Sequence, residues 1–370
     1  MTSRYQPLLT PAPARLINAQ RQPVFGLFTE SVPELAMADF DFRSVMDMPV
    51  RGLRRHFAQK QFQFVTVCGT TWVDGAPQDW LLAVAIADVR YVSSGFVYFF
   101  QNGQLVFQQG CLRPLQFGCQ MSASPLEGLA RLQAGRQYWQ FQLSAAGWQL
   151  EVQCGPIAAT LLLHRSPAPS APSQAPLALC APTGYQGFTY TEKNNALAVS
   201  GQLQVAGREI ALTDARGGYD FSTGFMRRHT NWRWASINTL LDGEPFGLNL
   251  AAGVNETGLC ENACWHRGQI QHLSPAQFQF ERYPNQRQQQ SKQESQTTTY
   301  QPWSITTLCD EVSLTFTPVA CRQEKIQTGL LASNFRQYIG YYQGTVQRAD
   351  GQLLVLTNCL GLAEDHYATW

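Results

Sequence analysis

Hydrophobic and polar residues alternate along much of the chain, with the period of two that is typical of β-strands lying on a core. In the segment 136–143, Trp139, Phe141 and Leu143 alternate with mostly polar residues, so one face of the strand is apolar. Other short runs in the first half are rich in aromatic and β-branched residues and occupy residues 62–69, 80–89, 95–100, 104–110, 148–154, 159–165 and 187–192. This pattern predicts an all-β fold of antiparallel strands.

One segment, residues 124–135, has the features of a short helix. Ser124 is a suitable N-cap, a Leu-rich stripe follows it, and Gly135 is a suitable end. We therefore expect little helix beyond this segment.

The spacing of the runs predicts two units. The Pro/Ser-rich stretch at 166–176 resembles a linker, but only about seven runs precede it, and a closed barrel needs about eight strands or more. Three further runs follow it, so we place the domain boundary between residues 218 and 219. The second unit has about eight runs, at 231–240, 246–253, 260–268, 276–283, 303–308, 312–319, 338–348 and 352–358. We expect two consecutive antiparallel β-barrels, residues 1–218 and 219–370, with surface loops at 166–176 and 285–300.

Charge and hydrophobicity narrow the class of partner. The chain has 27 Lys and Arg against 26 Asp and Glu, a net charge of +1, so no overall field favours nucleic acid. The longest apolar run, residues 80–87, is far shorter than the ~20 residues of a transmembrane helix, and no signal peptide is evident. We therefore expect a soluble cytoplasmic protein without a transmembrane segment, whose oligomeric state the sequence leaves open.

Signatures of common cofactors are missing from the sequence, which contains no GxGxxG, Walker A, HExxH or GxSxG motif. A metal site is conceivable at Cys260, Cys264, His266 and His272. However, their spacing matches no usual zinc pattern, and buried cysteines beside surface histidines explain them as well. We expect neither a cofactor nor a metal ion.

Candidate chemistry concentrates at residues 225–238, which read FMRRHTNWRWASIN. A strand here places Thr230, Trp232 and Trp234 on one face. Two tryptophans in a row form a wide apolar wall that suits a pocket for a flat or long apolar ligand, or else they simply fill the core.

Asp220 is the polar residue with the two most clearly different possible roles, because a buried carboxylate must be paired or lose its charge. It either forms an ion pair with Arg228, His229 or Arg233, or has a raised pKa and acts as an acid on a ligand. Glu261 and Glu364 have the same ambiguity. Asn249, Asn255 and Asn262 can bond a ligand or neighbouring strands equally well.

Several of these residues form a pattern that resembles a known family. Asp-x-Ser-x-Gly at 220–224, Trp-x-Trp at 232–234, Gly-Leu-Asn-Leu at 247–250, Glu-Asn at 261–262 and the ending at 361–370 are the main elements, with Thr230, Asn255 and Trp265 between them. Together they resemble the bacterial family catalogued as domain of unknown function 2804, over nearly the whole chain.

More distantly, residues 199–224 resemble the passage that joins the two barrels of lipocalin-like proteins related to carotenoid hydratase (hydroxyneurosporene synthase) and tocopherol cyclase. This resemblance implies two lipocalin-like barrels and a preference for lipid- or isoprenoid-like molecules. It implies no particular reaction.

We therefore expect a protein that binds an apolar small molecule in or between two β-barrels. The alternatives are a cofactor-independent hydratase, isomerase or cyclase with Asp220 as general acid, and a structural protein whose interior is packed solid. The expected catalytic residues are Asp220 and His229, and the expected ligand-binding residues are Arg228, Thr230, Trp232, Trp234, Asn249, Asn255, Glu261, Asn262, Trp265 and Glu364.

Overall fold

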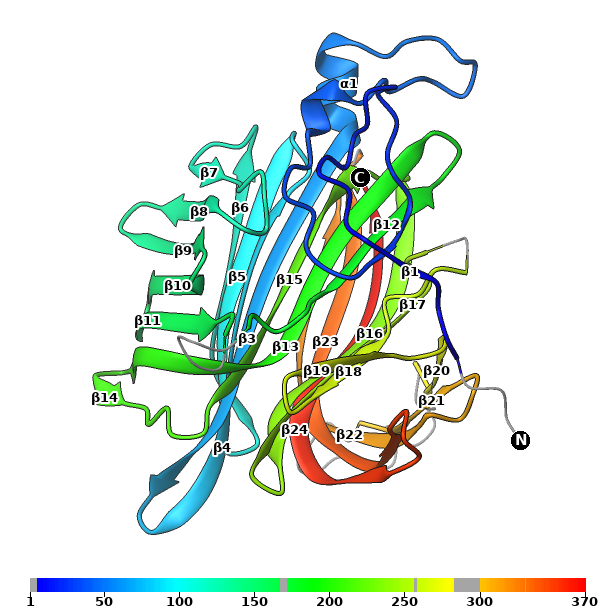
Figure 1. The fold of residues 1–370 in the computed structure, drawn as a ribbon. Helices are drawn as coiled ribbons and strands as arrows, with labels where there is room; N and C mark the ends of the chain where they lie inside the picture. Colours follow the sequence, from blue (N-terminus) through cyan, green and yellow to red (C-terminus); the bar gives the residue numbers. More distant parts are fainter. Residues whose placement is uncertain (1–4, 167–171, 256–257, 283–299, 330) are drawn as a thin grey trace.

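The computed structural model describes residues 5–166, 172–255, 258–282, 300–329 and 331–370, and two large β-sheets account for most of them (Figure 1). Within the described residues the first sheet has fifteen strands and the second has nine. The prediction of an all-β fold with two antiparallel units is confirmed.

The first sheet curls almost into a barrel. Its path runs β6 (Gln104–Pro114), β5 (Val92–Gln101), β4 (Ala76–Asp88), β3 (Gln59–Val73), β15 (Arg216–Phe225), β13 (Gly187–Val205), β11 (Ile157–His164), β10 (Gly147–Cys154), β9 (Gln137–Ser144), β8 (Gly128–Ala134) and β7 (Cys119–Gln120). Strands β1 (Leu9–Thr10), β2 (Gly26–Phe28), β12 (Leu177–Thr183) and β14 (Arg208–Glu209) pair off this path. The indole nitrogen of Trp139 in β9 donates to the carbonyl oxygen of Ala85 in β4 at 2.9 Å, which joins distant strands across the inside of the curl.

The second sheet is a half-barrel that faces the first (Figure 1). Its path runs β19 (Gln269–His272), β18 (Ala263–His266), β17 (Glu244–Ala252), β16 (His229–Leu241), β24 (Leu353–Thr369), β23 (Ala332–Gln347), β22 (Val312–Gln327), β21 (Trp303–Thr307) and β20 (Ala276–Gln279).

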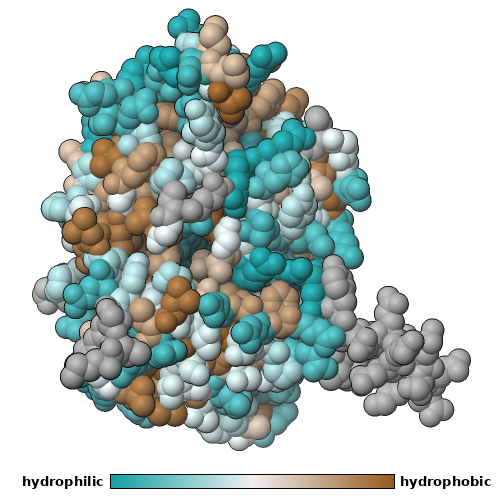
Figure 2. Space-filling view, turned by 90° about the vertical axis from the view of Figure 1, so that its right-hand side faces the viewer, coloured by the Kyte–Doolittle hydropathy of each residue, from teal (hydrophilic) through white to brown (hydrophobic). Residues whose placement is uncertain are grey.

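Apolar side chains form three main cores. One lies inside the first sheet and includes Trp139 and Trp148, and one lies inside the second and includes Trp303 and Phe316. A third lies between the sheets, where residues such as Tyr98 from the first sheet meet residues of the second. Because alternate residues of a strand point to opposite faces, each sheet supplies one row of side chains to its own core and another to the space between the sheets. On the surface shown in Figure 2, hydrophobic and hydrophilic side chains are interspersed.

The passage between the sheets lies next to the expected boundary. Strand β15 pairs with β13 and β3 as far as Phe225, and β16 begins the second sheet at His229. Residues 218 and 219 therefore lie within a strand of the first sheet. The division of the chain into two domains stays a prediction. The Pro/Ser-rich stretch connects two strands of the first sheet, and residues 167–171 lie outside the described part of the chain, as does most of the expected loop at 285–300.

The helix expected at 124–135 is wrong. Residues Gly128–Ala134 form β8, in which Ala130 and Leu132 are buried and Arg131 between them is more exposed. Pairing with β9 supplies the backbone hydrogen bonds, so tertiary context outweighs the helical propensity of the leucines. The described helices are instead α1 (Gly52–Ala58) and the 3-10 turn η1 (Met37–Asp39). No helix in the described ranges has the length and apolar character to cross a membrane.

Asn195 of β13 joins the two sheets. Its side-chain nitrogen donates to Ser236 Oγ at 2.8 Å and to the carbonyl oxygens of Ile237 and Leu248 at 3.2 Å. Gly247 allows this approach, because a Cβ at that position would lie 2.5 Å from the Cβ of Asn195. We call this contact the Asn195 junction.

Candidate functional site

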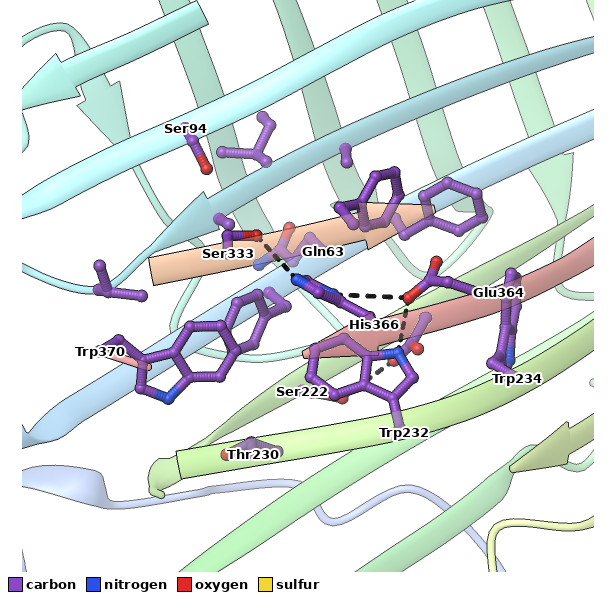
Figure 3. A pocket seen from close by; sticks show the side chains of 18 of the residues that line it. Gln63, Ser94, Ser222, Thr230, Trp232, Trp234, Ser333, Glu364, His366 and Trp370 are labelled. Atoms are coloured by element: carbon purple, nitrogen blue, oxygen red, sulfur yellow. Dashed lines mark hydrogen bonds and ion pairs between the residues drawn. The ribbon is translucent and has the colours of Figure 1, made fainter. Parts of the chain in front are cut away.

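A cavity of about 250 Å³ lies between the two sheets. Its walls come from β3, β5, β13 and β15 on one side and from β16, β22, β23 and β24 on the other (Figure 3). Most of the lining is aromatic or aliphatic, with Phe62, Phe64, Phe96, Trp232, Trp234, Phe335 and Trp370 as the large rings.

Strand register explains why these side chains share one wall. In the second sheet Trp232 lies opposite His366, and Trp234 lies opposite Glu364. On the other side of β24, Phe335 also lies opposite His366, and Gln337 lies opposite Glu364. The alternation of each strand therefore turns one row of side chains from β16, β24 and β23 towards the first sheet.

The two tryptophans are fixed through their indole nitrogens. Trp234 donates to Asn249 Oδ1 at 2.7 Å, and Trp232 donates to Glu364 Oε1 at 2.6 Å. With both N–H groups bonded to protein, these rings offer apolar faces to the cavity.

Three charged side chains meet at one part of the lining, and we call them the lysine cluster: Lys193, Asp220 and Glu261. Lys193 is almost fully buried, bonds to Asp220, and lies with Nζ 3.5 Å from Glu261 Oε2. Asp220 Oδ1 also accepts from Ser222 Oγ at 3.0 Å, and Glu261 Oε1 accepts from Asn255 Nδ2 at 3.2 Å.

The charges of the lysine cluster are unequal in number, since one cation faces two carboxyl groups. Burial lowers the pKa of Lys193, but the neighbouring Asp220 and Glu261 outweigh burial and hold that pKa above its usual value. Burial raises the pKa of Glu261, and Lys193 only partly opposes this rise. Because Asp220 has the closer contact with the ammonium, Glu261 is the carboxyl group that tends to keep a proton.

Asp220 is paired, but not with the expected residues. The expectation of Arg228, His229 or Arg233 as its partner is wrong. Its partner is Lys193, which is 27 residues away in the sequence but lies directly opposite Asp220 in the pairing of β13 with β15. Arg233 instead pairs with Asp365 at 3.4 Å. His229 is exposed and bonds to the hydroxyl groups of Tyr367 and Thr369. Asp220 nevertheless lines the cavity, so it is both a cavity residue and part of an ion pair.

A second polar group lies around His366, and we call it the histidine cluster: Ser333, Gln337, Glu364 and His366. Figure 3 labels Ser333, Glu364 and His366 of this cluster. His366 Nε2 lies 3.0 Å from Ser333 Oγ, and Nδ1 lies 3.7 Å from Glu364 Oε1. Glu364 Oε2 accepts from Gln337 Nε2 at 2.9 Å. The imidazole lies edge-on to Trp232, with ring centroids 4.3 Å apart.

Arg322 is a third charged group of the lining. Its guanidinium carbon lies 4.1 Å from the ring centroid of Phe96 and 5.3 Å from that of Phe335. It also pairs with Glu324 at 2.6 Å. The arginine therefore has both an anionic partner and aromatic neighbours.

A family model described as domain of unknown function 2804 matches residues 37–370. The chain belongs to this family. No curated protein matches the sequence.

Solved structures resemble the fold at low sequence identity. An AttH-like protein from Nitrosomonas europaea matches with a TM-score of 0.50 and 14% identity, over 84% of this chain and 92% of that chain. Kievitone hydratase from Nectria haematococca matches with a TM-score of 0.49 and 10% identity, and CghA with 0.48 and 9%; each match covers 84% of this chain and 88% of the other. At such identities the likeness concerns the fold alone.

Six of the residues proposed from the sequence line the cavity: Asp220, Thr230, Trp232, Trp234, Glu261 and Glu364. Asn249 and Asn255 are not part of the lining but form hydrogen bonds to Trp234 and Glu261 respectively.

Other proposed residues lie elsewhere. Asn262 bonds to the backbone of Ala251 and Ser274. Trp265 is buried against β12 and donates to the carbonyl oxygen of Ala175. The Arg228 side chain is exposed, and its backbone carbonyl accepts from the amide of Trp370.

The cysteine and histidine segment at 260–272 contributes to packing. Cys264 is buried in the core of the second sheet, and His266 Nδ1 lies 2.8 Å from Arg348. In the part of the chain that the structure describes, no three His, Cys, Asp or Glu side chains are placed to hold a metal ion.

Sequence reasoning missed Lys193, Ser333 and His366. A signal for His366 was present, because Glu364 and His366 are two residues apart and must share a face of a strand. Lys193 was also visible as a charge inside a long strand-like run, whereas nothing in the sequence singles out Ser333.

Proposed function

We propose that the protein binds an apolar small molecule in the cavity between its two β-sheets. The observation that carries this proposal is the apolar aromatic lining, above all Trp232 and Trp234, whose indole N–H groups are already bonded within the protein. Rings fixed in this way need no ligand hydrogen bond and gain from an apolar contact.

The volume limits the size of the ligand. At about 250 Å³ the cavity lies just below the roughly 300–1,000 Å³ range of common ligand pockets. A compact isoprenoid or lipid-like molecule, or one end of a longer molecule, is the ligand that fits best.

Two measurements test binding. Native mass spectrometry of protein purified from its own cells should detect a bound apolar molecule, and titration with that molecule should quench tryptophan fluorescence. Ala251→Leu enlarges a side chain in the cavity wall and should weaken binding. Ala145→Leu, at an exposed turn, is the matched control and should bind normally. A protein that is purified without a ligand, and whose tryptophan fluorescence no apolar compound quenches, would favour a structural role without ligand binding.

A second candidate function is a cofactor-independent hydratase, isomerase or cyclase that acts on such a molecule with Asp220 as general acid. The raised pKa of Glu261, caused mainly by burial, supports this candidate because it favours a protonated carboxyl group in the same cluster. Asp220 Oδ2 already accepts a hydrogen bond from Lys193, and Glu261 in the same cluster is the alternative proton donor.

The carboxyl variants distinguish binding from catalysis. If Asp220 is the acid, Asp220→Asn should fold and bind ligand, but it should accumulate a ligand that differs in mass or isomer from the one carried by the wild type. If Glu261 is the acid, Glu261→Gln should do so instead. Identical ligands in all three proteins would support binding without reaction.

A further inference from the structure

The polar groups of the cavity differ in how completely they are satisfied. Lys193 has two carboxyl neighbours, and Arg322 has Glu324. His366, by contrast, has a ring nitrogen, Nδ1, that is buried without a hydrogen-bond partner. The cavity therefore contains an imidazole whose hydrogen bonding is incomplete.

Glu364 is held firmly beside this imidazole. Trp232 donates to one of its oxygens at 2.6 Å and Gln337 donates to the other at 2.9 Å. Gln337 is fixed in turn, because its Oε1 accepts from Tyr98 of the first sheet at 2.6 Å. Both carboxyl oxygens are thus held by N–H donors, and Oε1 lies 3.7 Å from His366 Nδ1.

We propose that His366 is the proton-transferring group of the cavity, that Glu364 positions it, and that Ser333 donates a hydrogen bond to an oxygen of the ligand. This inference rests on the proposed function, because it needs a ligand in the same cavity. It adds the class of that ligand: an apolar β,γ-unsaturated carbonyl compound, in which the C–H bond lies between the carbonyl group and a carbon–carbon double bond.

The contacts of the imidazole fit the role of a proton acceptor. In the neutral ring with its proton on Nδ1, Nε2 accepts from Ser333 Oγ at 3.0 Å, so Nε2 is the basic nitrogen. When Nε2 takes a proton, the imidazolium lies beside Glu364, whose negative charge stabilises it. Trp232 and Phe335 pack against the ring with centroids 4.3 and 5.0 Å away, which fixes its orientation.

The proposed step is an isomerisation that needs no other reactant. His366 Nε2 takes a proton from the carbon next to the carbonyl group, the C–H bond breaks, and its electron pair forms an enolate. The hydroxyl of Ser333, released from Nε2, donates to the enolate oxygen. The imidazolium then returns the proton to a different carbon of the conjugated system, so the product has the composition of the substrate.

The probe for this inference is 5-nitrobenzisoxazole, a small flat molecule. A base removes its ring C–H proton, the N–O bond breaks, and a coloured nitrophenolate forms. We expect the wild type to bind the probe, measured by tryptophan quenching, and to turn it over with saturation. His366→Gln should keep the dissociation constant within about threefold, while kcat falls about a hundredfold, the usual size of a general-base contribution.

Glu364 and Ser333 have separate readouts. Glu364→Gln keeps an acceptor for Trp232 but removes the charge, so kcat should fall while KM stays close to that of the wild type. Ser333→Ala should lower kcat less than His366→Gln does. The matched control is His164→Gln, on the distant strand β11, which should be indistinguishable from the wild type.

Four outcomes would overturn the inference. Equal turnover by wild type and His366→Gln would show that another group is the base, and loss of turnover in Asp220→Asn alone would assign that role to the lysine cluster. A wild type that binds the probe without turning it over would refute proton transfer but leave ligand binding intact. A wild type that neither this probe nor any other apolar compound quenches would refute the binding proposal as well.

Discussion

The lysine cluster and the histidine cluster lie in one cavity, yet they are built differently. Lys193 and Asp220 come from the first sheet, and Glu261 comes from the segment that leads into β18 of the second, so the lysine cluster connects two sheets. Ser333, Glu364 and His366 come from the adjacent strands β23 and β24 of one sheet. The lysine cluster therefore connects the sheets through charges, which must stay paired to keep the sheets together, whereas the histidine cluster contacts the first sheet through a neutral hydrogen bond, from Tyr98 to Gln337.

Removal of Lys193 should give the largest effect on stability. Lys193→Met leaves the buried Glu261 and the partly buried Asp220 without their cation, and loss of one partner from a buried ion pair costs about 3–5 kcal/mol. We expect a loss of this size in the free energy of unfolding, measured by urea denaturation. Lys325→Met, at an exposed position of β22, is the matched control and should change stability little.

A triple variant checks the cause of that loss. Lys193→Met combined with Asp220→Asn and Glu261→Gln removes all three charges and should recover much of the stability. If the triple variant is as unstable as the single one, the loss comes from packing. The paired charges of the lysine cluster would then not be what stabilises the contact between the sheets.

Asp220→Asn should have a smaller effect. Lys193 keeps Glu261 at 3.5 Å, and the new amide can still accept from Ser222, so we expect a loss of about 2 kcal/mol, typical of a hydrogen bond to a charged group. Thermal and urea unfolding measure it. A loss as large as that of Lys193→Met would mean that Asp220 alone holds the lysine in place.

Trp232→Phe tests how much the histidine cluster contributes to the free energy of unfolding. It keeps a ring against His366 but removes the N–H that bonds to Glu364, and we expect a loss of about 1–2 kcal/mol. Trp72→Phe, at an exposed tryptophan, is the control and should be neutral. A loss above that of Lys193→Met would show that the histidine cluster is the stronger structural element.

The smallest expected effect is a pH dependence. Because burial raises the pKa of Glu261, the folded protein holds a proton there above pH ~4.3 that the unfolded chain has released. Its contribution to stability is present below pH ~4.3 and is lost as the pH rises through the folded pKa, by at most about 1.4 kcal/mol per pH unit.

Glu261→Gln should therefore flatten the decline in stability above pH ~4.3. Urea unfolding of both proteins at a series of pH values measures the difference. Glu192 has a raised pKa for the same main reason, burial, but it is present in both proteins, so its contribution cancels. Parallel curves of stability against pH for the wild type and the variant would contradict a raised pKa at Glu261.

The sequence allows the strands to be predicted better than the contacts between them. Alternation at Trp139, Phe141 and Leu143 predicts a strand, and Trp232 and Trp234 reach the same cavity because they share a face. The helix expected at 124–135 failed because pairing with β9 decides the structure of that segment.

The partners of the site residues could not be predicted for a related reason. Lys193 meets Asp220, and Ser333 meets His366, through strand registers that join residues 27 and 33 positions apart. A pattern of period two shows which face a side chain takes, but a shift of two residues in the register keeps the face and changes the neighbour.

The Asn195 junction has a consequence for how this scaffold can change over evolution or in the laboratory. It fixes the meeting of the sheets through main-chain carbonyl groups and the closely packed Gly247, and none of the residues that form it lines the cavity. Substitutions in the cavity wall therefore leave the residues of the Asn195 junction unchanged. A library that varies the aromatic wall while it keeps Asn195 and Gly247 should yield mostly folded proteins with new ligand preferences.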